Sequence, residues 1–472
     1  MSRDAAVAAA TAYCDRGGLR EELARYVAMR TESQRDDRTG EALRYVDALR
    51  AALEPMGFGC EVLANPAPGG GPFLYAERIE GPELLTVFSY GHGDVIHGQD
   101  EQWSNGRSPW TLGIEGKRWY GRGTADNKGQ HLINIRALGA LLASRGRLGF
   151  NVRILIEMGE EVGSPGLREL CARHRDRFRA DVLIASDGPR FKAAQPTLFL
   201  GARGALNFDL VVDLREGGHH SGNWGGLLAN PGIILAHALA CTVSAQGKVL
   251  ARSLVPEVLP GPVRQALAGL ELERHESDPE IDPGWGEPGL TPVERLYGWN
   301  TFEVLAVTAG NPARPVNAIP PRASAHCQIR FVVGRDPATF LPALRAHLDS
   351  HGLAMVGIER SPKGYFPATR LDPESQWPIW AAASIQRTTG KTPAVLPNFG
   401  GSLPNDVFSD ILALPTLWVP HSYPGCSQHA PDEHLLGPVA RESLALMAGL
   451  FWDLAESPPD VERRSPSHPG KR

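Results

Sequence analysis

The residues of this chain best suited to chemistry are histidines and carboxylates that could bind metal ions. They are His92, Asp126, Glu161, Asp187 and His429, and most of them follow an apolar run. Imidazole and carboxylate ligands without a cysteine thiolate suit a catalytic Zn²⁺-like site better than a closed structural one. The set therefore predicts a catalytic metal site, provided that the fold brings the five residues together.

The elements expected to position these residues are strands that end just before them. The run 84–90 breaks into Gly-His92-Gly-Asp94, the run 152–158 into Gly-Glu160-Glu161, and the run 181–186 ends at Asp187. In open α/β sheets, ligands bind outside the carboxyl ends of the strands, so these side chains can converge on one crevice. Asp126 precedes a predicted amphipathic helix over 128–143, and His429 lies in a loop far downstream.

Length and composition place the chain among ordinary globular proteins. With 472 residues it is too long for one hydrophobic core, so we expect two domains. An apolar fraction of 42% and a net charge of −5 argue against nucleic-acid or membrane partners. The amino end is expected to begin a helix rather than a signal peptide. Six scattered cysteines indicate reduced core residues of a cytoplasmic protein.

The order of predicted elements indicates an insertion. Strands and helices alternate up to about residue 187, which is typical of an α/β domain with a largely parallel sheet. A compact α+β pattern follows, strand-helix-strand-strand-helix-strand, over 206–214, 233–245, 301–307, 323–333, 337–351 and 354–360. We therefore predict a discontinuous metal-binding domain over 1–203 and 369–456, an inserted domain over 204–368, and a disordered tail over 457–472.

Each candidate ligand alone also has an ordinary structural explanation. A single histidine such as His92 is often a buried core residue, and Asp126 could cap the helix that begins at Lys128. Glu160 and Glu161 could begin a helix, and Asp187 before glycine could form a turn. Their joint occurrence in this order is what favours a metal site.

The ordered motifs resemble one family of di-zinc metallopeptidases. It contains carnosinase-type dipeptidases, glutamate carboxypeptidase, aminoacylase, succinyl-diaminopimelate desuccinylase and acetylornithine deacetylase. The motifs are residues 92–94, 121–129, 159–161, 187 and 429–431, and the resemblance runs from about residue 20 to 450. The Asp-Asn-Lys-Gly run at 126–129 and the block 103–109 resemble the dipeptidase branch. The resemblance implies a zinc-peptidase-like α/β domain with helices on both faces of a mostly parallel sheet, interrupted by a ferredoxin-like lid and dimerisation domain.

The resemblance also implies a role for each motif residue. Asp126 would bridge two divalent metals, most simply Zn²⁺, with Co²⁺ or Mn²⁺ as alternatives. One metal would also bind His92 and Asp187, and the other would bind Glu161 and His429. Glu160 would be the general base for a hydroxide that bridges the metals. Asp94 would hydrogen-bond a ligand imidazole and set its tautomer.

The inserted domain and one downstream loop carry further residues that match the family. His220 matches a histidine that, in relatives, reaches across a dimer to polarise the scissile carbonyl. Asn317 and Arg330 fall where the family binds substrate, and Arg330 could clamp a terminal carboxylate. Gly401 and Ser402 lie in a glycine-rich loop that lines the substrate site in relatives. Taken alone, these could equally be turn residues, a flexible loop or a surface ion pair.

These observations predict a metal-dependent amide hydrolase, and the resemblance implies that it forms a homodimer through its lid. The favoured activity is that of a dipeptidase or carboxypeptidase on dipeptides or short peptides with a free carboxylate. The alternative is deacylation of N-acyl amino acids, because the same groups can hydrolyse either bond. A non-catalytic binding protein on this fold would require a lost ligand or base, and the sequence retains them all.

Overall fold

A computed structural model of the chain describes residues 2–274 and 279–461, and it divides into two compact units. The first unit contains the chain up to Leu200, then Leu371–Leu396, and the chain from Pro404 onward. The second contains Gly201–Arg370 and Pro397–Leu403. The insertion predicted over 204–368 did not include the returning segment 397–403. Of the tail predicted to be disordered over 457–472, residues 457–461 belong to the described part of the chain and residues 462–472 lie outside it.

A mixed sheet with the strand order β1-β2-β6-β3-β7-β16-β8-β15 forms the centre of the first unit. The strands β6, β3, β7 and β16 run parallel to one another, whereas β1, β2 and β8 each pair antiparallel to a neighbour. The bounds in sheet order are Gly59–Leu63, Phe73–Arg78, Asn151–Glu157, Thr86–His92, Val182–Ala185, Thr416–Trp418, Thr197–Phe199 and Ala394–Leu396. The carboxyl ends of β6, β3 and β7 therefore lie at one edge of the sheet.

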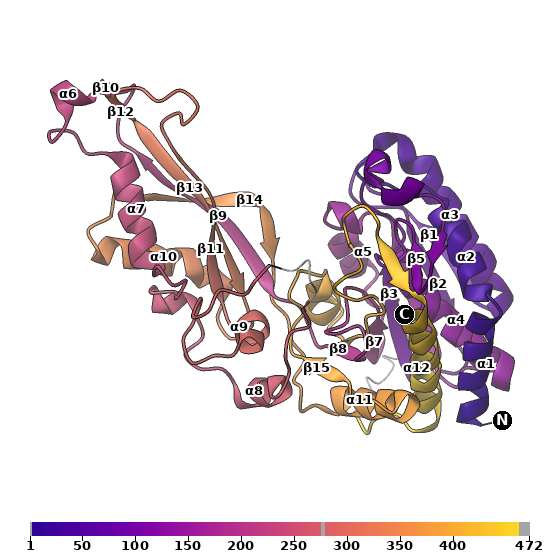
Figure 1. Cartoon of the computed structure of the whole chain (residues 1–472). Coiled ribbons are helices and arrows are strands. Elements are labelled where there is room, and N and C mark those ends of the chain that lie inside the picture. The colour runs from indigo at the N-terminus through magenta and orange to yellow at the C-terminus, as the bar shows by residue number, and fades with distance from the viewer. Residues whose placement is uncertain (1, 275–278, 462–472) are drawn as a thin grey trace, which may run out of the picture. The chain divides into compact units, whose positions relative to one another are not determined.

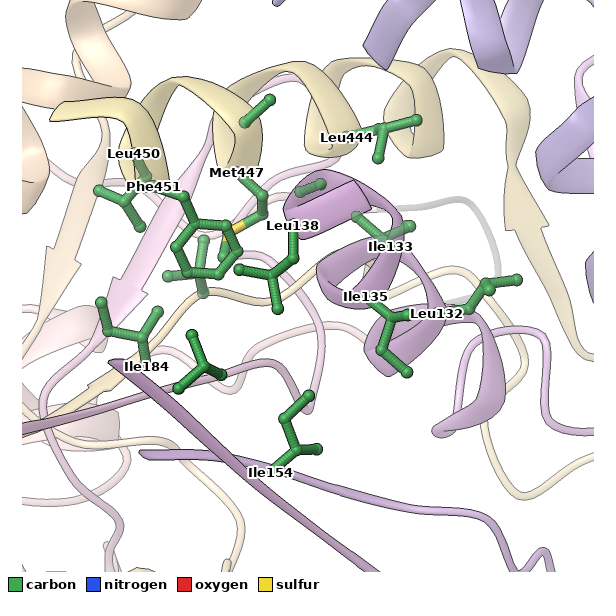
Figure 2. Close-up of a cluster of buried hydrophobic side chains, with 14 of the residues drawn as sticks. Leu132, Ile133, Ile135, Leu138, Ile154, Ile184, Leu444, Met447, Leu450 and Phe451 are labelled. Atoms are coloured by element: carbon green, nitrogen blue, oxygen red, sulfur yellow. The ribbon is translucent and has the colours of Figure 1, made fainter. Parts of the chain in front are cut away.

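The main hydrophobic core lies between this sheet and a layer of helices. Helix α4 (Lys128–Arg145) is buried on nearly all sides, because α12 (Gly437–Glu456) and α1 (Arg3–Asp15) cover the side that faces away from the strands. Figure 2 shows Leu138 of α4 and Phe451 of α12 above Ile154 and Ile184 of the strands. The remaining helices of this unit are α2 (Gly18–Val27), α3 (Thr39–Leu53), α5 (Leu167–Arg173) and α11 (Gln376–Thr389).

Aromatic side chains cover the opposite face of the sheet. Phe88 and Tyr90 of β3 contact Phe408 from the short helical segment Val407–Ile411, and Phe88 also contacts Phe178 beyond α5. Val87, next to Phe88 in the same strand, belongs instead to the main hydrophobic core, since successive side chains of a strand point to opposite faces. The predicted α/β class with helical segments on both faces is confirmed.

A small sheet, β4 (Gly113–Glu115), β5 (Arg118–Tyr120) and β17 (His434–Leu436), joins two distant parts of the first unit. His434 pairs with Tyr120 across β17 and β5. Because β5 ends just before the loop that carries Asp126, and β17 begins just after the loop that carries His429, this pairing holds the two loops side by side.

The second unit has the predicted ferredoxin-like order of elements (Figure 1). Its antiparallel sheet has the order β11-β13-β9-β14, and α7 (Pro231–Thr242) and α10 (Phe340–Ser350) pack against each other. The strands are β9 (Gly204–Asp213), β11 (Thr301–Ala309), β13 (Arg322–Phe331) and β14 (Gly357–Phe366). Smaller elements are β10 (His219–His220), α6 (Ser221–Trp224), α8 (Gly261–Leu267), α9 (Pro292–Gly298) and β12 (Ala318–Ile319).

All six cysteines are free thiols; Cys60 and Cys241 are partly exposed and the other four are buried. Among the described residues, no helix combines the length and the apolar character needed to cross a bilayer.

Candidate metal centre

The parallel strands place three of the predicted ligands at one edge of the central sheet. His92 is the last residue of β3, and Glu161 lies in the short helical turn Glu160–Val162 that follows β6. Asp187 comes two residues after β7. Since β3 lies between β6 and β7 and all three run parallel, their ends bring the three side chains to one place.

Asp126 and His429 complete the cluster and divide it into two groups. Nε2 of His92 lies 2.9 Å from Oδ1 of Asp126 and 3.7 Å from Oδ2 of Asp187. Nε2 of His429 lies 3.0 Å from Oδ2 of Asp126 and 3.0 Å from Oε2 of Glu161. One group is His92, Asp126 and Asp187, and the other is Asp126, Glu161 and His429. Within each group, one ligand atom of every residue lies within 4.8 Å of a ligand atom of the other two. The two oxygens of Asp126 thus face different groups, as a bridging carboxylate would.

The electrostatics of the cluster show an excess of negative charge. Burial raises the pKa of Glu161 to about 7 and that of Asp187 to about 6, and the Asp126 carboxylate adds to both shifts. Burial also raises the pKa of Glu160 well above its usual value, with Asp187 and Asp126 contributing. Only Asp126 keeps a lowered pKa, because hydrogen bonds with His429 and His92 outweigh its burial.

This donor set fits divalent cations. Crowded, buried carboxylates can all be ionised together only if positive charge is placed between them. Carboxylate oxygens and imidazole nitrogens are ligands that Zn²⁺ and similar ions accept, and the geometry offers two groups that share Asp126.

Asp94 connects two of the motifs. Its carboxylate oxygens accept hydrogen bonds from the backbone N–H groups of Glu160 and Glu161, each at 3.1 Å. Nδ1 of His92 lies 3.4 Å from Oδ1 of Asp94 and 3.1 Å from its main-chain oxygen. With its proton on Nδ1, His92 presents the Nε2 lone pair to the cluster, which is the tautomer a metal ligand needs. The sequence predicted the contact with the imidazole but not the one with the Glu160 turn.

Glu433 and Gln428 also support the cluster, and sequence reasoning missed both. The buried Glu433 accepts hydrogen bonds from the backbone N–H groups of Ala125 (2.9 Å) and Asp126 (3.1 Å), and from Nη1 of Arg122 (2.8 Å). Nε2 of Gln428 donates to Oδ2 of Asp126 at 2.6 Å. The sequence indicated Glu433 only as an acid four residues after His429. Its partners near Asp126 are distant in sequence and are brought to it by the pairing of β5 with β17.

In the second unit, the residues that match the family's substrate-binding positions form two separate groups. His220 ends β10, which pairs with β12, and the backbone oxygen of Asn317 accepts from the N–H of Ser221 at 2.9 Å. His220 and Asn317 are thus neighbours, and both are exposed. The other group contains Arg330, whose Nη1 donates to Oγ of Ser402 at 3.1 Å, with Gly401 preceding Ser402. Arg330 lies near the end of β13 and the first group lies beyond its start, so at least about 26 Å of strand separates them.

A second arginine, Arg203, lies close to Arg330 and was also missed. It is buried, and burial together with the charge of Arg330 lowers the pKa of Arg203 to about 10. Among the described residues, no carboxylate lies within ion-pair distance of either guanidinium. Glu303 interacts with Arg203 only beyond ion-pair distance. Two neighbouring guanidinium groups without an ion-paired carboxylate form a site suited to an anion.

Comparison with known proteins agrees with this geometry. The chain is 25% identical to the β-Ala-His dipeptidase of Rattus norvegicus over 455 residues, which cover 93% of this chain and 89% of the relative. It is 24% identical to the cysteinylglycine-S-conjugate dipeptidase of Corynebacterium striatum over 81% of this chain and 82% of the relative. Its fold matches human carnosine dipeptidase 1 with a TM-score of 0.73 at 22% identity, covering 95% of this chain and 99% of the other.

The family assignment follows from a family model that matches more than half of the chain. The model that describes peptidase family M20/M25/M40 matches residues 88–453, which include all five predicted metal ligands and the inserted unit. Members of this metallopeptidase family are hydrolases that use divalent metal ions. The chain belongs to peptidase family M20/M25/M40.

Proposed function

We propose that the protein is a dipeptidase that uses two divalent metal ions, most simply Zn²⁺. The observation that carries the proposal is the shared position of Asp126 between the His92–Asp187 group and the Glu161–His429 group. Relatives that align over most of the chain are named as dipeptidases, which favours a dipeptide substrate.

In this proposal each residue of the centre has a defined task. Bound cations would polarise the scissile carbonyl and lower the pKa of the attacking water. Glu160, next to the ligand Glu161, would accept a proton from that water and deliver it to the leaving amine. Asp94 positions His92 and the Glu160–Glu161 turn through the contacts described above.

The arginine pair is the proposed binding site for the free carboxylate of the substrate. Arg330 is half-buried and retains donors beyond those directed to Ser402 and Gln328. A carboxylate there would neutralise the charge shared by Arg330 and Arg203. Arg330→Lys keeps the charge but loses the planar fork, so we expect KM for dipeptides to rise more than kcat falls.

We further propose that the protein is a homodimer through the second unit. Val304, Leu305 and Val307 of β11 are 40%, 54% and 57% exposed, and β11 is an edge strand. An exposed apolar edge strand is a template for pairing with another chain. Ala309 at the end of this exposed stretch pairs with Ala323, close to the β10–β12 pair that carries His220. A partner seated on β11 would therefore lie next to His220 and Asn317.

The proposed activity is tested by parallel assays of dipeptides and N-acetyl amino acids on the metal-loaded protein. We expect turnover of dipeptides, and Glu160→Gln should retain bound metal while losing about 10²-fold or more in kcat. Turnover of acylated amino acids alone would establish a deacylase instead. Unchanged turnover in Glu160→Gln would remove that residue from its proposed role.

A mixing experiment tests the dimer and the role of His220 together. Glu160→Gln and His220→Ala should each be inactive as homodimers. If His220 serves the centre of its partner, mixed dimers regain one site with both residues intact, and activity returns on subunit exchange. If His220 serves its own chain, mixing restores nothing. Val307→Arg should yield monomers in sedimentation experiments; a dimer that persists would place the interface elsewhere.

We also propose a cytoplasmic location, on the ground that all six cysteines are free thiols.

A further inference from the structure

A second cluster of metal-binding side chains lies in the second unit, apart from the catalytic ligands. Cys241 is in the last turn of α7, His347 is in the last turn of α10, and His351 caps the carboxyl end of α10. One ligand atom from each of the three side chains lies within 4.8 Å of the other two. Cys241 and His347 are half-buried and His351 is exposed, so an ion can reach the cluster from solvent.

The hydrogen bonds of both histidines leave the lone pair of one ring nitrogen of each free. Nε2 of His347 donates to the backbone oxygen of Cys241 at 2.8 Å, since a carbonyl can only accept. Nδ1 of His351 donates in the same way to the backbone oxygen of His347 at 2.8 Å. The opposite nitrogens, Nδ1 of His347 and Nε2 of His351, therefore keep their lone pairs. Metal-binding histidines in proteins are commonly oriented by such a bond to a carbonyl.

The positions of the three residues follow from the fold. His347 and His351 are four residues apart, so they lie on one face of α10. Helix α10 packs against α7 (Figure 1). The bond between His347 and the Cys241 carbonyl joins the two helix ends. An ion bound at this place would link the two helices that support the sheet of this unit.

We propose that Cys241, His347 and His351 bind one borderline or soft divalent cation, of which Zn²⁺ is the probe, with water completing a tetrahedral site. Zn²⁺ accepts thiolate and imidazole ligands in this combination. As the metal–sulfur bond forms, the Cys241 thiol loses its proton to solvent, while both imidazoles bind in their neutral form. The site differs in chemistry from the catalytic centre, whose five candidate ligands include no sulfur.

That difference in chemistry supplies the test. Co²⁺ is titrated into the metal-depleted full chain while absorption is recorded in the near-ultraviolet, where thiolate-to-cobalt charge transfer appears. Because the catalytic ligands are oxygen and nitrogen atoms, such a band reports only a thiolate site. Because the catalytic ligands also take up Co²⁺, up to three ions bind per chain. We expect the amplitude of the band to saturate at the value for one thiolate-bound Co²⁺ per chain, and Zn²⁺ to abolish the band by displacing Co²⁺.

Matched variants decide which residues bind. Cys241→Ser should abolish the band, and His351→Ala should weaken Co²⁺ binding at this site at least tenfold. Cys60→Ser, at the other partly exposed thiol, and His326→Ala, at a histidine of β13 paired with Asp209, should leave the band unchanged. Absence of the band in the unmodified chain at millimolar Co²⁺, or its persistence in Cys241→Ser, would overturn the proposal.

Discussion

The buried ion pair between Glu433 and Arg122 offers the sharpest prediction about how the metal centre is held. Both side chains are 1% exposed, and Nη1 of Arg122 donates to Oε2 of Glu433 at 2.8 Å. Among the described residues, Nε and Nη2 of Arg122 have no hydrogen-bond partner, and its other favourable contact is with the ring of Trp103 at 5.7 Å. Glu433 thus supplies the counter-charge of the buried Arg122 guanidinium.

The magnitude follows from what a substitution leaves behind. Glu433→Gln keeps the volume of the side chain but leaves the Arg122 guanidinium buried without a counter-charge, which costs about 3–5 kcal/mol. Arg122→Met removes that charge, and in the double variant Glu433→Gln with Arg122→Met neither charge of the pair remains. We therefore expect the double variant to be less destabilised than the sum of the single variants, with a coupling energy of about 2–3 kcal/mol.

The same pair should control metal affinity through Asp126. In Glu433→Ala, the backbone N–H groups of Ala125 and Asp126 also lose their acceptor, so the loop that carries the bridging ligand is released. Glu433→Gln is the matched control, because its amide oxygen can still accept from both. We expect Zn²⁺ affinity to fall about 10–100-fold in Glu433→Ala, and less in Glu433→Gln.

Two measurements test this reasoning. Hydrogen exchange of the α4 amides, with a chelator present, reports the opening free energy of the first unit without a contribution from the second. Competition with a chromophoric chelator gives the Zn²⁺ affinity. Free energies of the single and double variants that add within about 0.5 kcal/mol would refute the claim that Arg122 depends on Glu433. Equal Zn²⁺ affinity in the Ala and Gln variants would refute the role of the backbone N–H groups.

Three further predictions concern the ligands, acid stability and the core. Asp126→Asn should reduce the bound metal of both groups in elemental analysis, whereas Asp187→Asn should affect one, because only Asp126 belongs to both. Burial lowers the pKa of His131 to about 3, with the charge of Lys128 contributing, so His131 is neutral in the fold. Its contribution to stability is complete above the unfolded pKa of about 6.5 and is lost as pH falls toward 3; His131→Gln should flatten this acid loss in thermal melts. Phe451→Ala should cost about 3–5 kcal/mol in the α4 exchange measurement, since Phe451 is 1% exposed between α12 and the sheet.

Helices and strands with a clear local pattern were predicted from the sequence. Where the predicted first or last residue of an element was wrong, the structure shows a physical cause. The helix predicted over 233–245 is α7, Pro231–Thr242; it begins earlier because the Asn230 side chain accepts from the N–H groups of Gly232 and Ile233. The strand predicted over 354–360 is β14, Gly357–Phe366, which continues past a proline and a glycine. Its position at the edge of the sheet and the register shift between Arg360 and Tyr365 allow this.

The features that were not predicted depend on contacts between distant residues. The segment 397–403 belongs to the second unit because Phe399 hydrogen-bonds Gly201 and lies beside Ala202, contacts nearly 200 residues apart in sequence. The environment of Arg203 depends in the same way on Arg330 of another strand. Hydrophobic periodicity reports the face that an element buries, but it carries no information about which remote polar group lies opposite.

The metal ligands are positioned in two ways, and only one of them could be predicted from the sequence. His92, Glu161 and Asp187 follow strands of one parallel sheet, so an apolar run before each of them already predicts where they lie. Asp126 and His429 lie in loops. The pairing of β5 with β17 brings these loops together, and Glu433 accepts a hydrogen bond from the backbone N–H of Asp126. Ligands at strand ends are held by the whole hydrophobic core, whereas the loop ligands are held by a few buried polar contacts. Substitutions in those contacts should therefore weaken metal binding before they disturb the sheet.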